Sequence, residues 1–301
     1  MILTITEGRR NFQIDPASSV CLAIPYEYNG SQPNFYNTPT GSATPFQQNN
    51  FVGEVKNNKG CNVMVINQNI HCTGTHTECA SHILNQDIYI HDVLSPTFIQ
   101  TKLISITPEK WTETDESYHC PVDNNDQVIT KKKLIEKLHY PVDGLVLRTL
   151  PNHQEKLNRK YDSLNTAFLT TEAILYLDEL NIKHLVVDLP SIDRTDDNGE
   201  LGNHHHYFER VPPFEKTITE LAYIPDSVDD GSYFMLIEIP AMRLDAAPSR
   251  PFLFKFEELI SFLTSSSFCN DSITSVRFNG KTSSNTLIIE YRKVRNDALG
   301  E

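Results

Sequence analysis

The sequence predicts an α/β fold, because two successive segments each have the pattern of an amphipathic helix followed by a buried strand. In the first segment, residues 130–139 carry apolar side chains at helical spacing, and the apolar strand 144–149 follows. In the second, a helix ending at Leu180 precedes a strand at 184–189. Alternation of this kind indicates helices packed on the outside of a β-rich central layer.

The remaining elements are predicted from shorter patterns. Residues 1–60 are rich in Asn, Gln, Pro and Gly, which favours long loops around one or two strands. β-Branched residues in partial alternation predict a strand within 62–70, and two apolar runs predict strands at 233–239 and 251–256. The predicted elements of the main domain therefore end near residue 256.

The residues that follow form a predicted C-terminal extension. A short amphipathic helix is expected at 257–263, and two strands within 272–294 are joined near Asn279-Gly280, a dipeptide that favours hairpin turns. We therefore expect a single domain over residues 1–256, with a helix-plus-hairpin extension, residues 257–301, packed on it.

Composition and charge exclude several classes of partner. With 26 Lys and Arg against 39 Asp and Glu, the net charge is -13, so the average surface repels a nucleic-acid backbone. No window approaches the roughly 18 apolar residues of a membrane span, and the N-terminal apolar stretch is too short for a signal peptide. Six scattered cysteines without a CxxC pair indicate a reducing compartment, so we expect a cytoplasmic protein.

The segment from His71 to His82 carries most of the chemistry that the sequence offers. It holds three histidines and a glutamate directly after a predicted strand, and this ligand set suits zinc and neighbouring metals. His76 and Glu78, two positions apart, point to one side of an extended chain. Cys72 could supply a thiolate in place of the first imidazole. One histidine alone would suit a solvated loop, but the whole group predicts a metal site.

A second stretch of chain is needed, because a short loop rarely completes a metal shell. The run His204–His206 follows the predicted strand 184–189, and sites in α/β proteins tend to lie where strands end. Glu220, which falls in a predicted helix at 215–224, could add a second carboxylate. The sequence therefore predicts a centre shared between two distant parts of the chain.

The stretch GTHTECASH resembles the HxGTHxDxPxH signature of the cyclase family of metal-dependent hydrolases, which includes bacterial kynurenine formamidases. Residues 144–149, 168–173 and 187–193 are similar to further family segments in the same order, and the resemblance covers residues 15–256. It implies a cyclase-like domain that forms homodimers or homotetramers, with extended N-terminal segments that reach a neighbouring subunit. It also implies a small-molecule substrate.

Carried over by position, the resemblance implies one or two divalent ions, most simply zinc, with manganese as the alternative. The implied ligands are His71, His76, Glu78, His205 or a neighbour of it, and Glu220. The final histidine of the motif, His82, falls on the family's proton-transfer residue. The implied reaction is hydrolysis of an amide-like bond, a formamide or cyclic amide, or of an ester, by metal-activated water.

Three departures from the family pattern bear on these assignments. One extra residue separates His71 from Gly74, so strict spacing puts Cys72 in the first ligand position. A one-residue bulge, which Gly74 can absorb, would keep the imidazole there. Glu78 also replaces the family's Asp, and Ala80 stands where the family has Pro.

Two other functions remain open on the sequence. A catalytically silent member of the family would keep a metal or ligand site without turnover, although it would not need the extra imidazole of His82. A cysteine-dependent enzyme would use Cys72 or Cys79, although no separate Cys-His-Asp arrangement accompanies them. Sensitivity to alkylation together with indifference to chelators would reveal the cysteine-dependent enzyme.

Overall fold

The computed structural model describes residues 1–56, 60–161, 166–209 and 215–259. The chain separates into two compact units, a larger one of Cys21–Phe252 and a smaller one of Met1–Val20 with Leu253–Glu301. The predicted hairpin at 272–294 lies outside the described residues. The division into 1–256 and 257–301 therefore stays a prediction.

A nine-stranded sheet forms the central layer of the fold. Its strands, in spatial order, are β17 (Ala246–Pro248), β8 (His76–Glu78), β15 (Thr217–Glu220), β14 (His184–Val187), β12 (Gly144–Thr149), β9 (Ile99–Ile106), β16 (Gly231–Glu238), β18 (Arg250–Phe254) and β3 (Val20–Cys21). The four strands from β15 to β9 are parallel, and β8 and β16 run antiparallel to this group on either side. The predicted strands at 144–149, 184–189, 233–239 and 251–256 all belong to this sheet.

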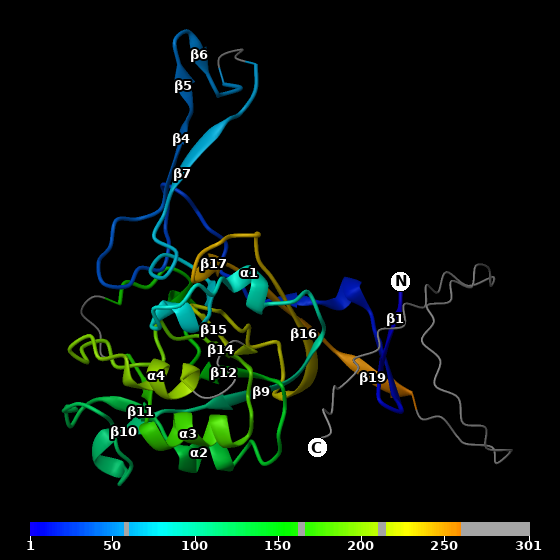
Figure 1. The fold of residues 1–301 in the computed structure, drawn as a ribbon, viewed down its shortest axis with the longest axis vertical. Coiled ribbons are helices and arrows are strands. Elements are labelled where there is room, and N and C mark those ends of the chain that lie inside the picture. Colours follow the sequence, from blue (N-terminus) through cyan, green and yellow to red (C-terminus); the bar gives the residue numbers. More distant parts are fainter. Residues whose placement is uncertain (57–59, 162–165, 210–214, 260–301) are drawn as a thin grey trace, which may run out of the picture. The chain divides into compact units, whose positions relative to one another are not determined.

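Three helices cover one side of the sheet (Figure 1): α2 (Lys131–Ile135), α3 (Thr171–Glu179) and α4 (Gly202–Phe208). Thr170 caps α3, because its side chain accepts a hydrogen bond from the backbone N–H of Ala173. Leu134, Ile174 and Leu177 are fully buried against strand residues such as Leu147. The predicted α/β fold, with a β-rich layer and outer helices, is confirmed.

The smaller unit contains an antiparallel sheet of β1 (Leu3–Glu7), β2 (Arg10–Ile14) and β19 (Phe256–Leu259). The rings of Phe12 and Phe256 meet edge to face at 5.2 Å, and Arg10 pairs with Glu258 at 2.7 Å. The helix predicted to start at residue 257 is therefore wrong in its described part. When β19 pairs with β2, its backbone N–H and C=O groups form hydrogen bonds within the sheet. In an isolated amphipathic turn, many of these groups would bond only to water.

A two-stranded ribbon, which we call the arm, extends from the larger unit (Figure 1). Its strands are β4 (Ser42–Pro45) and β7 (Met64–Asn67), and its outer part holds β5 (Gln47–Gln48) and β6 (Phe51–Val52). The strand predicted within 62–70 is thus present as β7, but all four of its residues are exposed. Its apolar side chains are not part of the core.

The other described elements are short. They are the strands β10 (Glu109–Lys110), β11 (Gln127–Ile129) and β13 (Phe168–Leu169), the helix α1 (Ile90–Val93), and the 3-10 turns η1 (Pro16–Ser18), η2 (Ala80–His82), η3 (Trp111–Glu113) and η4 (Gln154–Leu157). None of the helices in the described ranges is long and apolar enough to cross a membrane.

Candidate metal centre

The centre begins on β8, whose extended backbone puts His76 and Glu78 on the same face of the sheet. Glu220, the last residue of β15, is the cross-strand partner of His76, and its Oε2 lies 3.6 Å from Nε2 of that ring. The helix predicted around Glu220 is wrong, because the run Thr217–Glu220 pairs on both sides with neighbouring strands. All three side chains are buried.

His71 reaches the same place from the loop before β8. Its Nδ1 lies 3.2 Å from Oε2 of Glu78, its ring meets His76 edge to face at 5.1 Å, and it stacks on His82 at 4.4 Å. Cys72 instead packs in an apolar cluster with Phe35, Tyr161 and Leu221. The geometry therefore favours the imidazole over the thiol as the first ligand.

His82 ends the turn η2 on the outer side of the group. Its Nε2 lies 3.7 Å from Oε2 of Glu78, and its Nδ1 lies 3.2 Å from Oδ2 of Asp245. The side chain of His82 is 23% exposed, whereas that of His76 is fully buried. An imidazole that borders both the buried group and solvent can exchange protons with each.

Sequence reasoning missed Asp245. Its Oδ2 accepts hydrogen bonds from two rings, from Nε2 of His71 at 2.9 Å and from Nδ1 of His82 at 3.2 Å. The residue follows the motif by more than 160 positions, in the loop before β17, and no local pattern marks it. Pairing of β17 with β8, which places Ala246 opposite Glu78, brings it to the site.

On α4 the structure brings His204, and not His205, to the centre. Nε2 of His204 lies 3.0 Å from Oε1 of Glu78 and 3.6 Å from Oε1 of Glu220. His205 points outward, is 40% exposed and pairs with Glu209. This corrects the choice of His205. Successive helical residues are about 100° apart, so only one histidine of the run can face inward.

A signal for this choice was present in the sequence. Tyr207 and Phe208, three and four positions after His204, are large aromatic residues, and positions at this spacing share one helix face. Both rings are fully buried, as is His204. The aromatic pair therefore marks the inward face of α4.

Hydrogen bonds from the Nδ1 atoms, which point away from the centre, fix the ring orientation of His76 and His204. Nδ1 of His76 donates to the carbonyl of Gly74 at 3.0 Å, and Nδ1 of His204 donates to Asp193 at 2.6 Å. The Nε2 lone pairs then face the carboxylates of the centre. Such outer partners are what orients imidazole ligands toward a metal.

Five buried polar atoms of this group have no hydrogen-bond partner. They are Nδ1 of His71, Nε2 of His76, Nε2 of His204, and both Oε1 and Oε2 of Glu78. Acceptors that face one another without a donor need a cation between them. Around a tetrahedral zinc with bonds of about 2.0–2.1 Å, neighbouring ligand atoms lie roughly 3.3 Å apart. The separations of 3.0–4.0 Å around Glu78 fit such an ion.

The protonation equilibria show the same need for positive charge. Burial lowers the pKa of His71, but its contacts with Asp245 and Glu78 outweigh this and raise it to about 10. Burial also lowers the pKa of His204, yet the charge of Glu78 raises it well above its usual range. Burial alone would raise the pKa of Glu78, but the facing rings of His82 and His204 lower it. Without a metal, protons would supply the missing charge.

Thr75, Cys79 and Arg250 make contacts that a structural role explains. The hydroxyl of Thr75 donates to the carbonyl of Leu221 at 2.6 Å, which ties β8 to the end of β15. Burial raises the pKa of the Cys79 thiol, which disfavours a nucleophilic thiolate. Arg250 pairs with Glu238 at 3.6 Å at a surface pocket. None of these contacts requires a part in the reaction.

The fold and the centre together define an α/β protein with a candidate divalent-metal site. Its histidine and glutamate side chains come from β8, from the loop before β8, from β15 and from α4. The chain belongs to the Cyclase family: the model of this family, described as "Putative cyclase", matches residues 20–194. The resemblance to the cyclase family of metal-dependent hydrolases, which the motif between His71 and His82 indicated, is thereby confirmed.

Curated relatives and solved structures agree with this family. Kynurenine formamidase of Bacillus anthracis is 29% identical over 187 residues, 62% of this chain and 75% of that protein. The enzyme of the same name from Bacillus mycoides (strain KBAB4) is 29% identical over 206 residues, which cover 67% of this chain and 83% of that protein.

Two solved structures share the fold. A "predicted metal-dependent hydrolase" from Bacillus stearothermophilus superposes with a TM-score of 0.54 at 20% identity, over 79% of this chain and 98% of that one. Isatin hydrolase A from Labrenzia aggregata superposes with a TM-score of 0.54 at 13% identity, over 79% of this chain and 94% of that one.

Proposed function

We propose that this protein is a metal-dependent hydrolase that cleaves an amide-like C–N bond, a formamide or a cyclic amide, in a small molecule. One observation carries the proposal: five unpartnered buried atoms converge around Glu78, beside the partly exposed imidazole of His82. Relatives named kynurenine formamidase, and an isatin hydrolase of the same fold, support an amide rather than an ester substrate.

The proposed metal is zinc, with manganese as the alternative, because the donors are imidazole nitrogens and carboxylate oxygens. The residues that would hold it are His71, His76, Glu78, His204 and Glu220. When bound, a divalent cation lowers the pKa of water and polarises the scissile carbonyl. The two oxygens of Glu78 face different imidazoles, His71 and His204, so Glu78 would hold the metal together with both of these rings.

His82 is the proposed proton carrier. Because its Nδ1–H donates to Asp245, its Nε2 is left free to accept a proton on the side of the centre. Nε2 takes one proton from the attacking water as the new C–O bond forms. The same proton then passes to the leaving nitrogen as the C–N bond breaks, so the products are a carboxylic acid and an amine. Asp245 holds the ring in the orientation that this transfer needs.

The test combines metal analysis with a substrate panel. Protein without a histidine tag is analysed for zinc and manganese, then assayed on aryl formamides, cyclic imides and lactones. We expect stoichiometric metal and turnover of at least one amide. His82→Ala should keep the metal and lose at least 100-fold in kcat. Full activity in His82→Ala would refute its role, and bound metal without turnover of any compound would favour the silent member of the family.

A matched pair of variants tests the ligand set. His204→Ala should lose metal, because it removes an inward-facing donor, whereas His205→Ala removes an exposed neighbouring imidazole and should keep it. Equal metal content in the two variants would contradict the assignment.

A further inference from the structure

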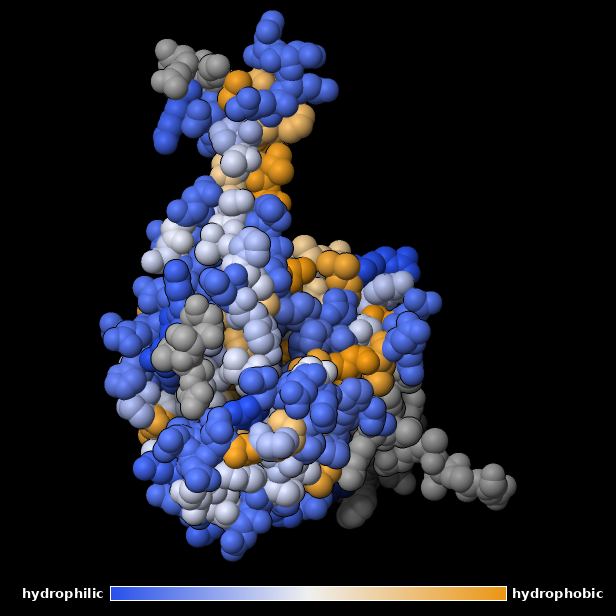
Figure 2. All heavy atoms as spheres, turned by 90° about the vertical axis from the view of Figure 1, so that its left-hand side faces the viewer, coloured by the Kyte–Doolittle hydropathy of each residue, from blue (hydrophilic) through white to orange (hydrophobic). Residues whose placement is uncertain are grey.

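Two apolar features of the larger unit lie outside the candidate metal centre. One is the arm, on which exposed apolar side chains such as Met64 and Ile66 gather (Figure 2). These side chains project from a two-stranded ribbon, whereas the second feature is a recess. A recess can surround a small molecule on several sides, so it is the better candidate for a ligand site.

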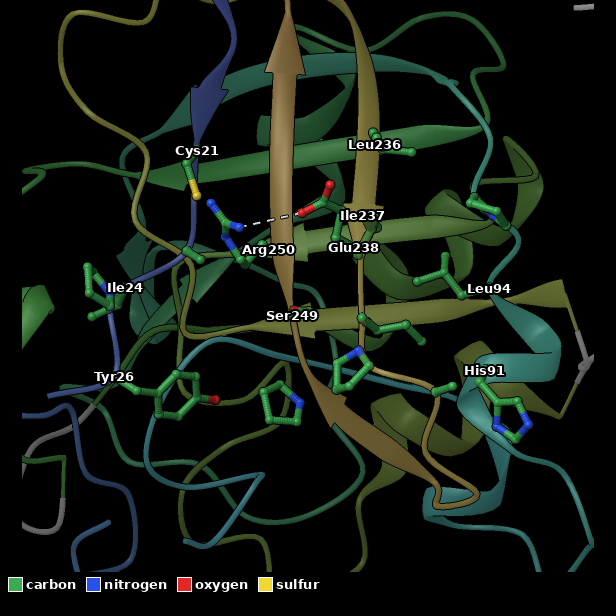
Figure 3. A pocket seen from close by; sticks show the side chains of 17 residues that line it. Cys21, Ile24, Tyr26, His91, Leu94, Leu236, Ile237, Glu238, Ser249 and Arg250 are labelled. Atoms are coloured by element: carbon green, nitrogen blue, oxygen red, sulfur yellow. Dashed lines mark ion pairs between the residues drawn. The ribbon is translucent and has the colours of Figure 1, made fainter. Parts of the chain in front are cut away.

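The recess is an apolar pocket of about 960 Å³ between β16, β18 and the loop that follows α1 (Figure 3). Its lining is mostly apolar and includes Ile24, Leu94, Leu236, Ile239 and Pro240. Pockets that hold small molecules typically measure about 300–1,000 Å³. The lining includes no residue of the metal centre, so this is a second place where the chain can hold a small molecule.

Ser249 brings an unsatisfied hydroxyl to the wall of this pocket. The residue is 3% exposed, and its buried Oγ has no hydrogen-bond partner among the residues that the structure describes. Its backbone N–H donates to the carbonyl of Thr75 at 3.1 Å, which holds the residue in place beside β8. Burial of a hydroxyl without a partner costs free energy. A ligand group that bonds to Oγ would remove this cost.

The charged and titratable groups at the pocket already have partners. Arg250 lies 3.6 Å from Glu238, and its guanidinium lies over the ring of Phe252 at 4.8 Å. Nδ1 of His91 donates to the carbonyl of Met242 at 2.6 Å. Because the opposite charges of Arg250 and Glu238 offset each other, the pocket offers little net attraction to an anion or a cation. It therefore suits a neutral occupant.

We propose that this pocket binds a neutral, largely apolar small molecule, and that one polar group of the ligand hydrogen-bonds to Oγ of Ser249. The apolar body of the ligand packs against the lining, which removes apolar surface of both partners from water. A hydroxyl can donate to a carbonyl or accept from an N–H, so a ligand with either group fits. Binding here does not depend on the metal centre, because the two sites share no residue.

The test titrates the purified full-length protein with two fluorescent probes that share one ring system. N-phenylnaphthylamine is neutral and has a single N–H that can donate to Ser249, whereas anilinonaphthalenesulfonate carries an added negative charge. We expect saturable binding of one neutral probe per chain, and binding of the sulfonate that is weaker by about tenfold or more, because burial of a charge is costly. No saturable binding of the neutral probe, or equal affinity for the two probes, would overturn the proposal.

Ser249→Ala tests the hydrogen bond. Removal of the hydroxyl should weaken binding of the neutral probe by roughly 2–10-fold, the usual contribution of one such bond. The free protein should unfold at the same temperature or a higher one, because the hydroxyl has no hydrogen-bond partner to lose in the described chain. Unchanged affinity for the probe, or a lower Tm of the free protein, would contradict the role given to Ser249.

A variant that fills the pocket locates the probe. Ala241 is exposed at the pocket, so Ala241→Trp should fold normally and weaken binding of the neutral probe by about tenfold or more. Ala17→Trp is the matched control, since Ala17 is also exposed but does not line the pocket, and it should bind as the unmodified protein does. So should His82→Ala, which alters the metal centre. Circular dichroism verifies that each variant is folded. Full binding by Ala241→Trp, or loss of binding in His82→Ala, would put the probe elsewhere and overturn the proposal.

Discussion

Asp193 controls how His204 is presented, and its replacement by asparagine gives the sharpest test of the proposed centre. Oδ2 accepts hydrogen bonds from the backbone N–H and from Nδ1 of His204, and Oδ1 accepts from the backbone N–H of Asn203 and from the hydroxyl of Tyr118. An amide has a single acceptor oxygen. In either orientation, the NH2 group of the new side chain faces at least one backbone N–H.

The expected loss follows from these contacts. Asp193→Asn replaces a charged acceptor with a neutral one, so Nδ1–H of His204 is held less firmly and the ring becomes a weaker donor to a metal. Removing an outer-shell carboxylate of this kind typically weakens metal binding by about 10–100-fold. That range corresponds to about 1.4–2.7 kcal/mol.

The assay is competition with a chromogenic chelator, with zinc as the titrant. Asp197→Asn is the matched control. Asp197 is also a buried aspartate of the same loop, but its oxygens accept from the backbone N–H groups of Gly199 and Leu201 rather than from His204. Asp197→Asn should leave metal affinity close to that of the unmodified protein. Equal zinc affinity of Asp193→Asn and the unmodified protein would refute the reasoning.

Three further predictions concern proton transfer, pH dependence and packing. Asp245→Asn should lower kcat, measured on the best amide of the panel, with little change in KM, because the carboxylate orients His82; an unchanged kcat would exclude that role. Burial would raise the pKa of Asp230, but hydrogen bonds from Ser105 outweigh this and lower it from 3.8. The ionised Asp230 carboxylate therefore contributes its full stabilisation of the fold above about pH 3.8, its pKa in the unfolded chain. This stabilisation is lost as the pH falls through the lowered pKa of the folded protein. Urea unfolding should show Asp230→Asn less stable than the unmodified protein at pH 7, with the gap closing below about pH 4. Leu147→Ala, at a fully buried core position, should cost about 2–5 kcal/mol in the same assay, and a cost below about 1 kcal/mol would contradict its place in the core.

Much of the fold followed from local patterns in the sequence. The strand 144–149 is found with the predicted bounds, and the helix predicted to end at Leu180 is present as α3, which Thr170 caps. These features depend on side-chain periodicity and on backbone groups at helix ends, which act over a few residues. The composition of the segment from His71 to His82 likewise showed which ligand types were available.

The sequence by itself supplied His71, His76, Glu78 and Glu220 as ligand candidates. It also put His76 and Glu78 on one face, because alternation along an extended strand is a local property. Tertiary structure alone decided that Glu220 ends a strand opposite His76 and that Asp245 completes the group. It also brought His204 rather than His205 to the centre, on the helix face that Tyr207 and Phe208 mark in the sequence. These outcomes depend on strand pairing and on burial of a helix face, which sum contacts among residues far apart in the chain.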